Sequence, residues 1–162
     1  MAQVAPRASA PNATHSVFTE EHELFRVTVH RFYEREMEPY YLQWEKEGKG
    51  TPKSFWKKAA EVGLVGMAFP PEYGGPGGDF LYNLILNEEM GRFVGGASVG
   101  AAINTDVMTN VLVEHGTHEQ KQQWAPGILS GDVVQALGLT EPGSGSHVHS
   151  MQTRARKQGD AY

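Results

Sequence analysis

The chain has no cysteine among its 162 residues, which excludes disulfide bonds and thiol chemistry and suits a reducing compartment. It is also poor in positive charge, because 14 Lys and Arg residues stand against 19 Asp and Glu, giving a formal net charge of −5. Proteins that bind nucleic acids display clustered Lys and Arg side chains. We therefore expect no nucleic-acid partner.

Long apolar stretches are absent as well. The longest run without a charged residue, 93–105, has thirteen residues, whereas a helix needs roughly 20 to span a bilayer, so we expect no integral membrane span. Residues 1–17 lack the apolar core of a secretory signal and are rich in Ala, Pro, Ser and Asn. We predict a disordered tail there and a cytoplasmic protein. The mitochondrial matrix is the alternative, because Arg7 and the lack of acidic residues weakly resemble a transit peptide.

Helical signals dominate residues 18–131, which we predict to form one helical domain. Apolar residues recur at steps of three and four, and N-capping residues precede several of these stretches. Thr117 with Gln120 three positions later predicts a capping box at the start of the last helix. Pro39 lies inside the first stretch and predicts a kink or two abutting helices. Small and apolar residues, among them Val107 and Val111, nearly surround the fourth helix, so we expect it to be buried. The five predicted helices cover residues 20–47, 52–62, 81–93, 98–115 and 118–129.

The pattern changes after the helices. The run "VVQALGLT" at 133–140 is short, apolar and bounded by turn residues, which predicts a strand, and residues 149–156 predict another. Two strands alone cannot bury their apolar faces. We therefore predict that residues 132–162 begin a β domain that is truncated here, so that the fold class is mainly α followed by the first strands of a β region. The alternative is a complete protein in which both strands pack on the helices.

A loop of small residues, "GLTEPGSGS" at 138–146, follows the first predicted strand. Gly143 and Gly145 would let backbone N–H groups approach an anion, and hydroxyl donors come from Thr140, Ser144 and Ser146. These groups suit a phosphate or pyrophosphate. Pro, Gly and Ser also build ordinary turns, and on chemistry alone an ordinary turn is the more frequent interpretation.

Other candidate sites are weaker. His147 and His149 would share one face of a strand, but a closed zinc site needs four ligands and no others are evident nearby, so we predict no metal site. Glu88 and Glu89 are adjacent on a predicted helix and do not face each other, as paired catalytic carboxylates must. No Ser/His/Asp order suggests covalent catalysis. We therefore assign no catalytic residue.

The loop and several further blocks resemble the acyl-CoA dehydrogenases, flavoproteins whose first signature has the pattern Thr-Glu-Pro-x-x-Gly-Ser-Asp. The resemblance covers nearly everything after residue 17 and is nearest to the long-chain members. It favours the phosphate-binding interpretation of the loop over an ordinary turn. Besides the loop, the blocks that carry it are "FTEEHELFR" at 18–26, "WEKEG" at 44–48, "GLVGMAFPPEYGGPGGD" at 63–79, "EEMGR" at 88–92 and "HGTHEQKQQWAPGILSGD" at 115–132.

The resemblance implies an N-terminal helical domain, a middle β domain and a second helical domain, with FAD as the cofactor. It implies an oxidoreductase that removes hydrogens from Cα and Cβ of an acyl-CoA thioester, giving trans-2-enoyl-CoA as in fatty-acid β-oxidation. Electrons would pass to an electron-transfer flavoprotein, and the complete enzyme would be a homotetramer or homodimer. Two alternatives are a non-catalytic helical interaction module and an oxygen-dependent flavin oxidase or monooxygenase with the same fold.

The resemblance also assigns a cofactor-binding run. Leu139 and Thr140 would approach the isoalloxazine ring. Gly145 and Ser146 would lie by the pyrophosphate, with Ser146 also touching the acyl-CoA substrate. The full run that the resemblance assigns to FAD is Leu137, Gly138, Leu139, Thr140, Glu141, Pro142, Gly143, Ser144, Gly145 and Ser146.

Two departures from the family pattern qualify these assignments. His147 stands where the family has Asp, and a neutral imidazole offers one acceptor nitrogen where a carboxylate could hold several backbone N–H groups. We therefore expect a looser loop and weaker cofactor binding. The resemblance also implies that the catalytic glutamate lies beyond residue 162, so we expect no activity from this chain alone.

Overall fold

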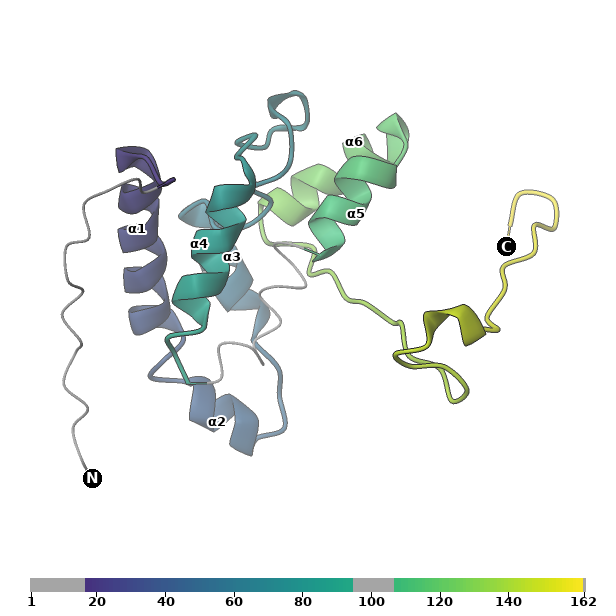
Figure 1. Cartoon of the computed structure of the whole chain (residues 1–162), viewed down its shortest axis with the longest axis horizontal. Helices are drawn as coiled ribbons and strands as arrows, with labels where there is room; N and C mark the ends of the chain where they lie inside the picture. Colours follow the sequence, from purple (N-terminus) through teal and green to yellow (C-terminus); the bar gives the residue numbers. More distant parts are fainter. Residues whose placement is uncertain (1–16, 95–106, 162) are drawn as a thin grey trace.

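The computed structural model describes residues 17–94 and 107–161, and within these ranges the chain is mainly helical. Helices α1 to α4 form one group, α5 and α6 lie beside it, and the segment after residue 132 extends away from both (Figure 1). The predicted tail and the start of the predicted helix 98–115 fall outside the described residues. The helices are α1 (Glu20–Glu36), α2 (Tyr41–Lys46), α3 (Lys53–Glu61), α4 (Phe80–Met90), α5 (Met108–His115) and α6 (His118–Leu129), with the short 3-10 helices η1 (Pro71–Tyr73) and η4 (Val148–Ser150).

The first predicted helix is divided in two, as Pro39 indicated. Helix α1 begins after Thr19, whose side chain accepts a hydrogen bond from the backbone N–H of His22, and it ends at Glu36. A turn then leads into α2 at Tyr41. Proline has no N–H to donate, and its ring collides with the carbonyl four residues earlier, so a single helix through residue 39 is disfavoured.

The core lies between α1, α3 and α4, where aromatic rings interlock. Phe32 of α1 and Phe55 of α3 have ring centroids 5.1 Å apart, and Trp56 meets Phe55 edge to face at 5.3 Å. Each such buried side chain contributes roughly 1.5–3 kcal/mol relative to an exposed one. Within the described ranges, the buried apolar residues are Val29, Phe32, Tyr33, Met37, Phe55, Trp56, Ala59, Leu64, Val65, Met67, Phe69, Ile85, Leu86, Met90, Ala125 and Ile128.

Helix α6 follows its sequence signals closely. The hydroxyl of Thr117 accepts from the backbone N–H of Gln120 at 3.3 Å, and the Gln120 side chain accepts from the backbone N–H of Thr117 at 2.8 Å. This reciprocal capping box was predicted, and so was the end of the helix at Leu129. Because both signals lie within a few residues of the helix ends, they act independently of the rest of the fold.

The expectation that the helix ending at His115 is buried all round is wrong for its described part. Val107 and Val111 remain 43% and 48% exposed. Helix α5 packs against α6, and its apolar pattern continues around to a face that no described residue covers. A pattern that is apolar on every side predicts burial only when neighbours exist on every side.

Neither predicted strand forms within the described residues. Residues 134–140 form an extended trace without a ladder (Figure 1), and the pairings described after them, as far as residue 161, are isolated bridges between Glu141 and Ser144 and between Gln158 and Ala161. Residues 149–156 begin in η4 instead. A strand needs a neighbour to bond its backbone N–H and C=O groups, and the described part of the chain offers none here. The apolar pattern of 133–140 therefore gives an extended connection.

Candidate functional site

The predicted cofactor loop lies on the exposed segment that follows the helices. Leu137 and Leu139 are 45% and 49% exposed, although both are apolar. Side-chain atoms added at Gly143 or Gly145 would meet nothing within 4 Å. The backbone at these two glycines is therefore open to a ligand from outside, which is the main steric requirement that the sequence placed on them.

Hydrogen bonds within the loop fix its shape. The backbone N–H of Glu141 donates to the carbonyl of Ser144 at 2.9 Å, and the N–H of Ser144 donates back at 3.1 Å. The hydroxyl of Ser144, a residue that is only 5% exposed, donates to the carbonyl of His147 at 3.0 Å. Ser150 donates to the same carbonyl at 2.8 Å and lies 3.2 Å from the carbonyl oxygen of Gly143. The turn is thus held by its own serines.

The carboxylate of Glu141 closes the loop from the other side. Its Oε2 accepts the backbone N–H of Gln152 at 2.8 Å, and its Oε1 accepts the N–H of Thr153 at 2.9 Å. These hydrogen bonds, from Thr153 and then Gln152, hold the pKa of Glu141 below its usual range. One ionised side chain therefore ties the start of the loop to a segment eleven and twelve residues later.

These contacts divide the predicted site residues into two groups. Glu141 and Ser144 direct their side chains to the protein's own backbone. Thr140 and Ser146 are exposed, so their hydroxyls are accessible. Gly143 and Gly145 do not adopt the left-handed conformation that alternates with a right-handed one in an anion-binding nest. Of the groups that suit a phosphate, the accessible hydroxyls and the open backbone are present, whereas the nest geometry is not formed.

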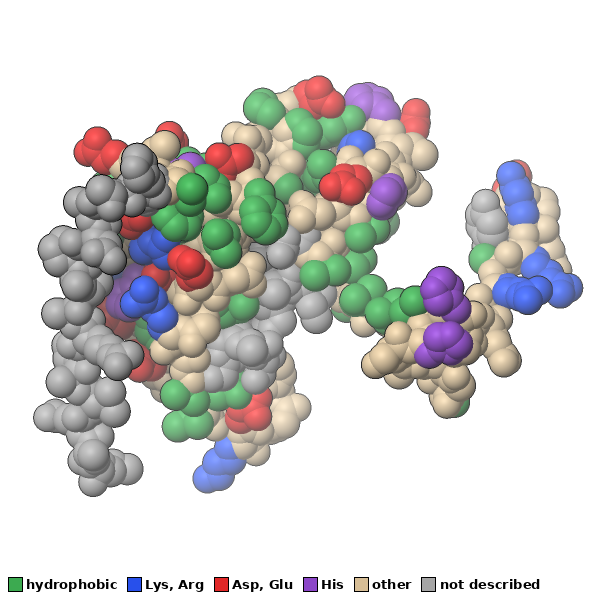
Figure 2. All heavy atoms as spheres, viewed as in Figure 1, with side chains coloured by type: hydrophobic (Ala, Val, Ile, Leu, Met, Phe, Trp, Pro, Cys, Tyr) green, Lys and Arg blue, Asp and Glu red, His purple; other side chains and the backbone are tan. Residues whose placement is uncertain are grey.

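The two loop histidines lie near each other without forming a recognisable metal centre. Their ring centroids are 6.0 Å apart and the rings are tilted edge to face (His147 and His149). Both side chains are exposed, and they stand out together on the segment after the helices (Figure 2). Among the described residues, no group of three or more His, Cys, Asp or Glu side chains is placed to hold a metal ion.

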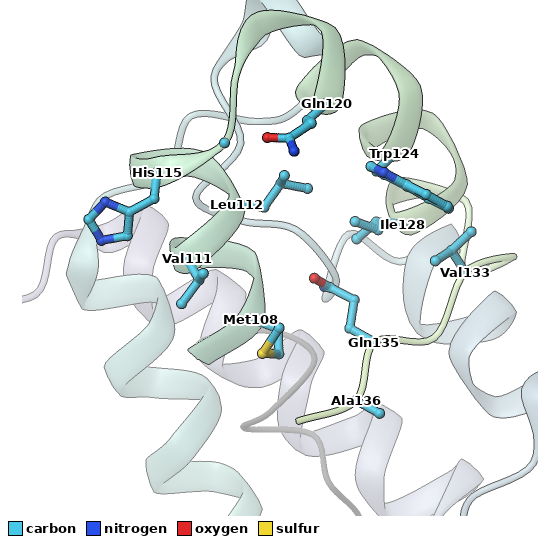
Figure 3. A pocket seen from close by; sticks show the side chains of 11 residues that line it. Met108, Val111, Leu112, His115, Gln120, Trp124, Ile128, Val133, Gln135 and Ala136 are labelled. Atoms are coloured by element: carbon cyan, nitrogen blue, oxygen red, sulfur yellow. The ribbon is translucent and has the colours of Figure 1, made fainter. Parts of the chain in front are cut away.

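A groove between α5, α6 and the extended connection was not predicted from the sequence. It encloses about 440 Å³ and is mainly apolar (Figure 3). Trp124 of α6, which is 45% exposed, forms one wall and Val111 of α5 lies on another. Gln135 lies at its edge and donates to the buried hydroxyl of Thr109 at 3.1 Å, which anchors the connection to α5. The sequence signal that could have indicated this groove is the apolar pattern of the helix predicted at 98–115.

The groove continues into further exposed apolar surface. Hydrophobic side chains run from the α5 and α6 side of the body along the extended connection toward the loop (Figure 2). Val134 is 44% exposed there.

A membrane span requires a long, apolar helix, and the described ranges contain no helix of that kind.

Comparison with known proteins defines the class to which these helices belong. The family model for the acyl-CoA dehydrogenase N-terminal domain matches residues 19–132, more than half of the chain. The chain belongs to the acyl-CoA dehydrogenase family.

Individual relatives agree with this assignment. Mitochondrial long-chain specific acyl-CoA dehydrogenase from Rattus norvegicus is 33% identical over 143 residues, which are 88% of this chain and 33% of that protein. An acyl-CoA dehydrogenase structure from Geobacillus kaustophilus superposes with a TM-score of 0.82 at 39% identity, covering 91% of this chain and 38% of that one. A glutaryl-CoA dehydrogenase from Mycobacterium smegmatis, solved with FADH2, gives 0.75 at 26% identity, covering 88% and 36%. The chain thus spans about a third of the length of these relatives.

Proposed function

We propose that this chain is the N-terminal part of an FAD-dependent acyl-CoA dehydrogenase that converts an acyl-CoA thioester to the trans-2-enoyl-CoA. The observation that carries this proposal is the exposed loop at 138–146, which presents accessible hydroxyls and open glycine backbone next to a matched helical domain. The Mycobacterium smegmatis relative, which was solved with FADH2, supports the choice of cofactor. When bound, FAD supplies the acceptor for the hydride that leaves the substrate.

Within this proposal the chain's own residues bind and orient. Thr140 and Ser146 would donate hydroxyl hydrogen bonds to the cofactor, and Ser146 would also contact the acyl-CoA. The backbone at Gly145 would approach the pyrophosphate, since a Cβ there would meet nothing within 4 Å. No Lys or Arg occurs between Glu141 and Thr153, so neutral donors would carry this part of the anion recognition.

The same proposal places the catalytic base outside the chain. Residues 18–131 would form the N-terminal helical domain and residues 132–162 the start of the middle β domain. An electron-transfer flavoprotein would accept the electrons, and the complete enzyme would be a homotetramer or homodimer. We propose a cytoplasmic location for it, with the mitochondrial matrix as the alternative.

The test uses the purified chain of 162 residues. Quenching of flavin fluorescence measures FAD binding, and a dye-linked assay measures oxidation of acyl-CoA. We expect the chain to bind FAD and to show no measurable acyl-CoA oxidation. Ser146→Ala should weaken FAD binding, whereas the matched control Ser54→Ala on α3 should leave it unchanged. Robust turnover by this chain would contradict the assignment of the base to a region outside it, and a complete lack of FAD binding would contradict the cofactor site.

The apolar groove favours a second candidate, a non-catalytic helical module that binds a protein partner. Exposed apolar patches of this kind often mark interaction surfaces, and Trp124 is a residue type enriched in such surfaces. This candidate predicts that the chain binds no FAD and that its association with a partner depends on Trp124. The FAD titration above separates the two candidates, because only the first requires the loop to bind flavin.

A further inference from the structure

We infer that Glu141 is the positioning residue of the cofactor loop, holding it in its binding shape through backbone hydrogen bonds rather than contacting FAD itself. The inference rests on the proposed function for the identity of the ligand. The clamp itself, which we define as the carboxylate of Glu141 with the backbone N–H groups of Gln152 and Thr153, stands on the geometry of this chain.

The distances show that both oxygens of the carboxylate are engaged. Oε1 and Oε2 each accept one backbone N–H, at 2.9 and 2.8 Å. These are charge-assisted hydrogen bonds, which are roughly twice as strong as neutral ones. The segment at Gln152 and Thr153 has no ladder within the described residues. The side chain of Glu141 therefore supplies acceptors that a neighbouring strand would otherwise supply.

Direct contact between Glu141 and the pyrophosphate of a dinucleotide is chemically unfavourable. A pyrophosphate is anionic, and a carboxylate beside it would repel it. With its two oxygens turned toward Gln152 and Thr153, the carboxylate instead fixes the chain direction at Pro142, which leads into the exposed residues Gly143, Gly145 and Ser146. Glu141 thus acts on the ligand through the backbone that carries these residues.

The clamp also changes the expected effect of His147 on the order of the loop. The family's carboxylate at that position was expected to hold the loop, and its replacement by histidine suggested a looser one. In this chain the carboxylate of Glu141, six positions earlier, accepts two backbone N–H groups. The carbonyl of His147 meanwhile accepts the hydroxyls of Ser144 and Ser150. Position 147 thus contributes to loop order through its backbone, which any residue provides.

The experiment compares Glu141→Ala and Glu141→Gln with the wild-type chain, with Glu61→Ala on α3 as the matched exposed control. Hydrogen exchange at the amides of Gln152 and Thr153 reports the clamp without any ligand, and flavin fluorescence reports FAD affinity. We expect Glu141→Ala to remove about tenfold or more of the amide protection, the size expected for a hydrogen bond to a charged group, and to weaken FAD binding by a similar factor. Glu141→Gln should restore part of both, since its amide retains one acceptor oxygen.

Ser146→Ala separates a positioning role from a contact role. It should weaken FAD binding while the amides of Gln152 and Thr153 stay protected. Circular dichroism checks that each variant keeps its helices. Unchanged protection in Glu141→Ala would overturn the clamp, and lost protection with unchanged FAD affinity would overturn the positioning role. If Glu141→Ala loses the amide protection but the wild-type chain binds no FAD, the clamp stands. The proposed cofactor site, and the positioning role with it, would then be overturned.

Discussion

The imidazole of His22 joins the N-termini of two helices by bonding to Asp79. Its Nε2 lies 3.3 Å from Asp79 Oδ1, and its Nδ1 accepts the backbone N–H of Thr19 at 3.1 Å. Because Nδ1 accepts, Nε2 carries the hydrogen and donates to the carboxylate. Asp79 in turn caps α4 by accepting the backbone N–H of Leu81 at 2.9 Å. One buried histidine therefore completes the cap of α1 and links it to the cap of α4.

Replacing His22 with alanine should destabilise the fold. The change removes half of the capping box of α1 and leaves the Asp79 carboxylate without its imidazole partner, so we expect a loss of about 2 kcal/mol in the free energy of unfolding. Urea denaturation followed by circular dichroism measures it. His115→Ala is the control, because the His115 side chain is 76% exposed, and it should change stability by less than about 0.5 kcal/mol. Equal effects from the two changes would contradict the linking role.

Two adjacent glutamates on α4 should differ sharply in their contribution. Glu89 has a side chain only 2% exposed, and its oxygens meet His30 Nδ1 at 2.9 Å, Arg92 Nε at 3.1 Å and Arg26 Nη1 at 3.4 Å. Glu89→Ala leaves cations that still reach water, so the loss is that of hydrogen bonds to a buried charged group, about 1.5–3 kcal/mol. We expect Glu89→Ala to lower the free energy of unfolding by an amount in that range.

Glu88→Ala is the matched comparison for Glu89. The carboxylate of Glu88 lies only 2.6 Å from Arg26 Nη1, closer than the carboxylate of Glu89, but the Glu88 side chain is 45% exposed. Water screens such a pair, so the expected loss is at most about 1 kcal/mol. Urea unfolding of both variants measures the difference. A larger effect from Glu88 than from Glu89 would show that distance, not burial, determines the strength of this cluster.

Helix positions were predictable because their causes are local. The capping box at Thr117 and the break at Pro39 depend on residues within one turn of each other, and both are confirmed. The strand predicted at 133–140 does not form in the described part of the chain, because pairing needs a second segment. The apolar pattern of one segment does not show whether its partner is present. The exposure of Val111 has the same origin, since an apolar pattern records what a residue can pack against and not what is there.

The site was predictable as a segment but not as an arrangement. The residue types of the loop pointed to anion binding, and those assignments stay predictions. The division between inward and outward side chains came only from the structure. Glu141 finds its partners eleven and twelve residues away at Gln152 and Thr153, a separation that no local signature encodes. The groove at Trp124 likewise depends on how α5 and α6 pack.

Gly131 should tolerate alanine poorly. Its φ is +71°, a conformation that costs L-residues roughly 1–2 kcal/mol. A Cβ there would also overlap the backbone carbonyl of Trp56. We expect Gly131→Ala to lower the free energy of unfolding by about 3 kcal/mol, the conformational cost and the collision together.

Gly159 provides the control that separates these two causes. Its φ is +62°, but an added Cβ would meet nothing within 4 Å. Gly159→Ala should therefore lose at most about 1–2 kcal/mol in thermal or urea unfolding, from the conformational cost alone. A similar loss in both variants would show that the contact with Trp56 relaxes without cost.

The clamp at Glu141 should open in acid. Hydrogen bonds from Thr153 and Gln152 hold the pKa of Glu141 below its usual range. A carboxyl group with a lowered pKa in the folded state stabilises that state fully above its unfolded pKa, and this contribution is lost as the pH falls through the lowered value. The amide proton shifts of Gln152 and Thr153, followed by NMR from about pH 7 to about pH 2, should therefore show one acidic transition below the usual glutamate range. Glu141→Gln has no carboxyl group to titrate at this position and should lack this transition. Amide shifts that stay constant through acid, or that move equally in Glu141→Gln, would mean that the ionised carboxylate does not hold the loop.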